Sequence, residues 1–238
     1  MTIAMTDNDF ADREPTEVQL EFGEFFHAML RDAEGVDDMV CDGERGLSAL
    51  HHLLILGILG LALHGLALGV VIHLATPALP LSFATQGMPL LWVPLALVGG
   101  FLSSIAICLP SFYFYTQLSG LDASFRLVTA QSLRVQARTS VLLLGILPFY
   151  LAWALSSFLG ISQIDQVVAL GFIIPFLMGF AGLYSVYQSF RRLAKKLPIT
   201  HTRRGQFVLR LVLCWGAVTA TVAPVAVFRL AQTFSGVL

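Results

Sequence analysis

The chain has 238 residues, of which 56% are hydrophobic and only 12% charged, and its mean hydropathy is +0.78. Soluble domains usually carry about 25% charged residues, so this composition excludes an ordinary soluble globular domain. The net charge of −1 hides a strong asymmetry: residues 1–48 hold 13 acidic residues against three arginines, whereas the rest of the chain holds 11 basic residues against two aspartates. The sequence therefore predicts a membrane protein with an acidic N-terminal segment.

Residues 1–48 are predicted to form an acidic cytoplasmic tail that contains an amphipathic helix at residues 16–34. Phe22, Phe25 and Met29 recur there at helical spacing, and acidic side chains occupy the other faces. Helices that lie on a membrane surface usually carry Lys and Arg on their polar face. We therefore expect this helix to dock on a partner protein or on the protein's own basic loops; the alternative is a marginal helix in a flexible tail.

A long uncharged stretch follows the tail. Gly46 to Leu121 is a run of 76 residues without Asp, Glu, Lys or Arg. About 20 apolar residues cross a hydrocarbon core of roughly 30 Å, and a charge at the centre of a span costs a few kcal/mol. The stretch therefore predicts two spans and a turn, and the remaining chain repeats the pattern. The predicted fold is an all-α polytopic helix bundle, with a transmembrane domain at 49–238 and five spans at about 50–75, 90–117, 140–159, 167–190 and 207–232.

Small residues and prolines punctuate these spans. Gly65 and Gly69 form a small-xxx-small match in the first span, which predicts a close approach of a second helix. Each of the four later spans contains a proline near its middle or end, and a proline removes one helical hydrogen bond. These prolines are Pro110, Pro148, Pro175 and Pro224.

The charges between the spans predict the orientation. The connection between spans two and three holds three arginines, on one face of a predicted basic amphipathic helix at 121–138 that lies at the interface or projects from it. The connection between spans four and five holds six basic residues, and the other two connections hold none. Because positive loops stay cytoplasmic, we expect the N-terminus in the cytoplasm and the C-terminus outside.

The six basic residues between spans four and five are the first candidate site. They are Arg191, Arg192, Lys195, Lys196, Arg203 and Arg204. One interpretation is a topology determinant that also contacts lipid headgroups. The other is a docking surface for the acidic tail, an anionic lipid or a partner protein, since each basic residue near an anionic surface contributes about 1 kcal/mol. The acidic tail beside them argues against nucleic acid as the partner.

His64 is the second candidate, because it is an ionisable residue near the middle of the first span. A bis-histidine haem site needs a second histidine on another span, and spans two to five contain none, so a haem would require an oligomer. A hydrogen-bonding packing role is the favoured interpretation, and a ligand or proton-relay role is the alternative. No arrangement typical of an enzyme is found, and we expect no enzymatic activity, no cofactor and no metal.

Several short motifs carry a family resemblance from about residue 90 to 238. They are SFYFYTQLSG (111–120), SFRLVTAQSL (124–133), GLYSVYQSFRRL (182–193) and RRGQ (203–206). With them the chain resembles a bacterial member of the Yip1 family of five-span membrane proteins. The resemblance implies a non-enzymatic integral protein of a bacterial inner membrane that shapes membranes or recruits partners. The DLYGPF-like stretch of eukaryotic members has no counterpart here, so binding of a small GTPase is not carried over.

Three functions remain open from the sequence. The first is a membrane scaffold or adaptor that contacts protein partners through the acidic tail and the basic loops. The second is a transporter or permease subunit, in which the prolines break helices around a midplane site near His64. The third is an accessory subunit of a larger membrane complex. A homo- or hetero-oligomer is compatible with each.

Overall fold

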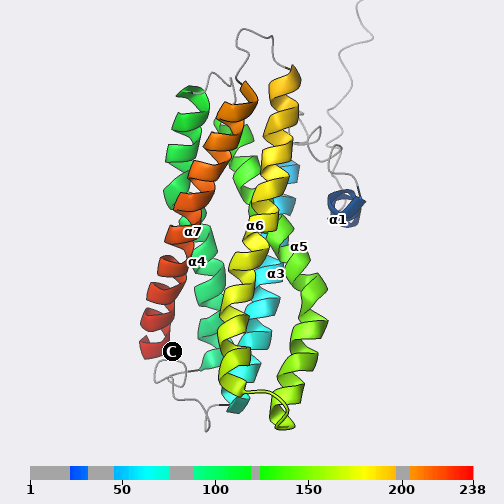
Figure 1. Cartoon of the computed structure of the whole chain (residues 1–238), viewed down its shortest axis with the longest axis vertical. Helices are drawn as coiled ribbons and strands as arrows, with labels where there is room; N and C mark the ends of the chain where they lie inside the picture. Colours follow the sequence, from blue (N-terminus) through cyan, green and yellow to red (C-terminus); the bar gives the residue numbers. More distant parts are fainter. Residues whose placement is uncertain (1–21, 32–45, 76–87, 119–123, 197–203, 238) are drawn as a thin grey trace, which may run out of the picture.

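A computed structural model describes residues 22–31, 46–75, 88–118, 124–196 and 204–237 of the chain. These residues form helices and short turns, and no strand occurs among them. The predicted all-α fold is confirmed (Figure 1). The helices are α1 (Phe22–Arg31), α3 (Gly46–Ala75), α4 (Pro89–Leu118), α5 (Phe125–Phe158), α6 (Ile164–Lys196) and α7 (Arg204–Val237).

The five long helices, α3 to α7, are each long and apolar enough to cross a membrane, which confirms the prediction of a five-span integral membrane protein. Their outward faces carry large apolar side chains, as a lipid environment requires. Ile107 is 63% exposed, Phe149 75% and Leu213 61%. Such surfaces are stable against hydrocarbon, whereas water would penalise them.

The long helices run side by side along the bundle (Figure 1). They form a ring in the order α3, α4, α7, α6 and α5, with α5 packing back on α3. Because successive helices alternate in direction, the starts of α3, α5 and α7 and the ends of α4 and α6 lie at the same end of the bundle.

Helix α5 differs from the prediction. The predicted interface helix at 121–138 and the third span at 140–159 are one continuous helix, Phe125–Phe158. The side-chain oxygen of Ser124 caps its start by accepting a hydrogen bond from the Leu127 amide, at 3.2 Å. At its other end a five-residue turn leads into α6, and there Gly160 adopts a φ of 78°, a left-handed conformation that favours glycine.

Two hydrophobic clusters fill the ring. One cluster lies toward the end of the bundle where α7 ends, and it includes Trp92, Leu143 and Val168, all fully buried. The cluster near the opposite end includes Phe112 and Trp215, whose rings stack with centroids 4.5 Å apart.

Glycines set the spacing between α3 and α4. A Cβ atom at Gly65 would lie 2.6 Å from the Cα of Pro94, and one at Gly69 would lie 2.6 Å from the carbonyl oxygen of Pro89. Real Cβ atoms are not found so close to a backbone atom, so the two helices can approach this closely only because both positions are glycine. The close approach predicted for Gly65 and Gly69 is confirmed.

Replacing Gly65 tests this packing. Gly65→Ala forces α3 and α4 apart, and we expect the free energy of unfolding to fall by about 1–3 kcal/mol. The matched control is Gly145→Ala on α5, where an added Cβ meets nothing within 4 Å. Unfolding in mixed detergent micelles, followed by circular dichroism, measures both variants; equal stability of the two would contradict the packing argument.

Candidate functional site

Buried polar side chains gather on the first half of α5. Eleven polar or charged residues are buried in the described part of the chain, and six of them belong to this helix. They are Gln131, Ser132, Arg134, Gln136, Thr139 and Ser140. Positions 132, 136, 139 and 140 share one helical face, so this face presents a polar stripe to the interior of the bundle.

The hydroxyl groups of the stripe have partners. Ser140 donates a hydrogen bond across the helix interface to the carbonyl oxygen of Gly57 in α3, at 2.7 Å. Thr139 donates to the carbonyl oxygen of Val135 within its own helix, at 2.8 Å. The amide of Gln136 is different: the residue is 2% exposed, and neither its Nε2 nor its Oε1 has a hydrogen-bond partner among the described residues.

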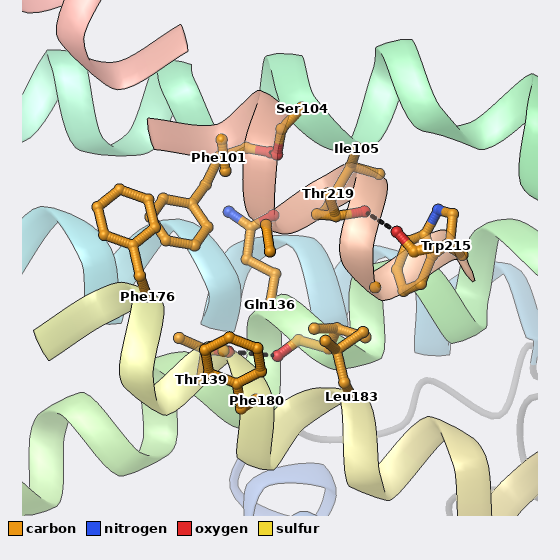
Figure 2. A pocket seen from close by; sticks show the side chains of 15 residues that line it. Phe101, Ser104, Ile105, Gln136, Thr139, Phe176, Phe180, Leu183, Trp215 and Thr219 are labelled. Atoms are coloured by element: carbon orange, nitrogen blue, oxygen red, sulfur yellow. Dashed lines mark hydrogen bonds between the residues drawn. The ribbon is translucent and has the colours of Figure 1, made fainter. Parts of the chain in front are cut away.

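The Gln136 side chain lines a cavity of about 190 Å³ between α4, α5, α6 and α7. Figure 2 shows its amide pointing from α5 toward α4, where Phe101 and Ser104 lie, with Thr139 and Phe180 on the opposite side of the cavity. The other walls are mostly aromatic or aliphatic, and no Asp, Glu, Lys, Arg or His lines the cavity. The bundle therefore contains an uncharged cavity with one unsatisfied amide.

Arg134 is a residue whose placement the sequence did not predict. The predicted basic face at 121–138 places it on a surface, but in the structure it is 2% exposed. Arg126 and Arg138 on the same helix are half-buried. The prediction was wrong because α5 continues straight into the span, so neighbouring elements cover a face that an isolated interface helix would leave exposed.

The N-terminal helix α1 docks on the bundle. Phe25 is fully buried and Met29 is 2% exposed, in a cluster with residues from the starts of α3 and α5. The ring of His52 lies against Phe22 and Phe25, at centroid distances of 5.8 and 5.4 Å. The contact surface is therefore the chain's own α3 and α5. The rest of the predicted helix at 16–34 lies outside the described residues.

Arg138, from the predicted basic helix at 121–138, contacts α1 through a hydrogen bond. Nη1 of Arg138 donates a hydrogen bond to the carbonyl oxygen of Met29, at 2.6 Å. Met29 lies in the last turn of α1, where carbonyl groups have no donor within the helix and the helix dipole favours a cation. Arg138 thus acts as a C-terminal cap supplied by another helix.

His64 lies in the bundle interior, 1% exposed. Its Nε2 is 2.8 Å from the carbonyl oxygen of Gly171 in α6. A carbonyl can only accept, so Nε2 carries the proton of this bond. Gly171 is four residues before Pro175, which has no N–H to complete the helical hydrogen bond. The His64 side chain supplies the donor that Pro175 lacks.

This arrangement supports the packing role expected for His64. The ring lies beside Tyr150, with centroids 5.5 Å apart. Among the residues that the structure describes, no group of three or more His, Cys, Asp or Glu residues is placed to hold a metal ion. Helices α4 to α7 each continue through their prolines without a break.

The basic residues between α6 and α7 lie at one end of the bundle, and α1 docks on the side of the bundle in the same half (Figure 1). Arg191 is exposed and Arg192 half-buried near the end of α6. Lys195 and Lys196 are the last two residues of α6, and Arg204 is the first residue of α7. Arg203 lies outside the described residues. At least five of the six predicted residues are therefore grouped at one end.

Comparison of the chain with protein-family models, with curated proteins and with solved structures finds no match. The resemblance to the Yip1 family stays a prediction from the sequence motifs.

The pairing of His64 with Pro175 can be tested by a double-mutant cycle. His64→Leu leaves the Gly171 carbonyl without a donor, and we expect a loss of about 1 kcal/mol in the free energy of unfolding. In a Pro175→Ala background the same change should cost less, because alanine restores an N–H at position 175. Thermal unfolding in detergent measures all four proteins; a purely additive cycle would contradict the assignment.

The cap on α1 predicts a local effect of Arg138. Arg138→Gln removes a charge-assisted bond, and we expect the amides of α1 to exchange with deuterium about tenfold faster. Arg138→Lys should exchange at an intermediate rate, and Arg229→Gln, at an exposed position on α7, serves as the matched control. Exchange unchanged in Arg138→Gln would show that α1 does not depend on this bond.

Proposed function

We propose that the protein is a non-enzymatic membrane scaffold or adaptor, which holds its acidic N-terminal segment at the membrane surface for a partner protein. The observation that carries this proposal is the docking of α1 on α3 and α5. Phe25 and Met29 provide the buried apolar contact, and Arg138 provides the polar one. Almost all the acidic residues of the segment flank this docked helix in the sequence, so its docking tethers them to the bundle and a partner then has less chain entropy to overcome when it binds.

The charge of the segment indicates the chemistry of the partner. Residues 1–48 carry a net charge of −10, from 13 acidic residues and three arginines. A surface of this sign attracts a basic protein surface and speeds its association. The partner is therefore proposed to present a cluster of Lys and Arg residues, and the contact should weaken as salt is raised.

The location of the basic residues supports a cytoplasmic placement of this surface. Arg191 and Arg192, near the end of α6, and the start of α5 lie in the same half of the bundle as α1. Positively charged connections stay on the cytoplasmic side. The proposal places the N-terminus in the cytoplasm and the C-terminus on the opposite side of a bacterial inner membrane. The Yip1-like motifs of residues 111–206 agree with a protein that shapes membranes or recruits partners.

Site-specific photo-crosslinking tests the proposal in cells that make the full-length protein. A photoreactive residue replaces His27, which is exposed on α1, and in a control protein it replaces Phe149, which is 75% exposed on the lipid-facing part of α5. We expect one discrete protein adduct at position 27 and none of the same mass at position 149.

The charge of the segment provides the second comparison. Neutralising the six acidic residues of 1–21 by Asp→Asn and Glu→Gln changes should remove the adduct while α1 itself is left intact. An adduct that survives this change would contradict recognition by charge, and the absence of any adduct at position 27 would contradict the scaffold function.

A further inference from the structure

The cavity beside Gln136 is unusual because it places an unsatisfied amide in an otherwise apolar interior. Burial of an amide without hydrogen bonds is unfavourable, and buried polar groups in proteins are nearly always paired. Figure 2 shows the amide in the middle of the lining side chains. A donor, Nε2, and an acceptor, Oε1, are therefore both buried here without a partner among the described residues.

The neighbouring hydroxyl groups do not satisfy this amide. Ser104 donates its proton to the carbonyl oxygen of Phe101, at 2.8 Å, and Thr139 donates to that of Val135. Thr219 on α7 donates to the carbonyl oxygen of Trp215, at 2.9 Å. The polar groups of the lining side chains are thus the Gln136 amide, the indole Nε1 of Trp215, which also has no partner among the described residues, and the remaining lone pairs of these hydroxyl oxygens.

The cavity reaches the lipid-facing surface between α6 and α7. Phe180 on α6 is 58% exposed and Ala220 on α7 is also exposed, yet both line the cavity. Gly179 lies beside them, and an added Cβ there meets nothing within 4 Å. A ligand would therefore enter from the hydrocarbon phase of the membrane.

The size and the walls restrict the ligand further. An apolar cavity of about 150 Å³ holds one benzene molecule, so 190 Å³ accommodates one six-membered ring with small substituents. The rings of Phe101 and Phe176 stack 5.2 Å apart at one wall and offer a flat surface. An acyl chain has no group for the Gln136 amide, and the charged headgroup of a phospholipid has no counter-charge in this lining.

We propose that the cavity between α4, α5, α6 and α7 binds the ring of a neutral lipid that carries carbonyl groups, of the quinone class. The Gln136 Nε2 donates a hydrogen bond to a ring carbonyl, the aromatic side chains pack on the ring, and the tail leaves between α6 and α7 through the opening at Gly179 and Ala220. This site is independent of the docking of α1, so either proposal can fail alone.

Direct binding tests the proposal. The full-length protein in phosphatidylcholine nanodiscs is titrated with decylubiquinone, and binding is followed by the quenching of tryptophan fluorescence, to which Trp215 at the cavity contributes. We expect saturable quenching. Gln136→Leu should raise the Kd about tenfold through loss of one hydrogen bond. The matched control is Gln131→Leu, at a buried glutamine of the same helix that does not line the cavity.

A second pair of variants tests the opening. Gly179→Leu places a side chain in the mouth and should abolish saturable quenching, whereas Gly145→Leu, at an equally open position outside the cavity, should change the Kd less than twofold. If Gln136→Leu fails to fold, this pair of variants still tests whether quinone binds in the cavity.

Thermal stability separates the proposed role of Gln136 from a structural one. Without quinone, Gln136→Leu should be at least as stable as the wild type, because an unpaired amide is replaced by an apolar group. With quinone, the wild type should gain more in Tm than Gln136→Leu at the same quinone concentration, because its Kd is lower. Quenching that is non-saturable, or equal in all variants, overturns the proposal. The proposal is also overturned if the purified wild type retains a phospholipid that Gly179→Leu loses and Gln136→Leu keeps. The cavity would then hold an acyl chain.

Discussion

Polar groups inside a bilayer have no water to bond, so a group without a partner inside the bundle carries a large cost. The pairing of His64 Nε2 with Gly171 meets this constraint, whereas Nδ1 of His64 and the Gln136 amide have no partner among the described residues. Pro175 removes one backbone donor from α6, and a side chain from α3 replaces it at 2.8 Å. The single histidine at mid-depth of the membrane is thereby explained as part of the backbone hydrogen-bonding of a neighbouring helix.

The same constraint governs the contact between α3 and α5. A Cβ atom at Gly60 would collide with Ser140, whose Cα lies 2.7 Å from that position. The close approach allows Ser140 to reach the carbonyl oxygen of Gly57. Small residues and hydrogen bonds therefore act together: the glycines let the helices come close, and the bond then fixes their register.

The sequence predicted the features that depend on local composition. The five spans follow from hydropathy, which depends only on the local sequence. Gly65 and Gly69 predicted a close contact with another helix, but the sequence did not show that this helix is α4. The burial of Arg134 and Gln136 was not predicted, because it depends on which helices cover α5. A signal was present in the polar stripe at 132, 136, 139 and 140, which continues into an otherwise apolar span. The partner of His64 required the relative register of α3 and α6, which no local pattern contains.

The short turn at Gly160 limits how the bundle can deform. Only five residues separate the end of α5 from the start of α6, so the two helices form a hairpin that tilts as one unit. Helix α7 follows α6 in the chain at the opposite end of the bundle, so no short turn holds these two helices together at the Gly160 end. Fluctuations of the bundle are therefore expected to separate α6 from α7 more than other neighbouring helices. Changes in bilayer thickness or lateral pressure would alter the structure chiefly at this interface.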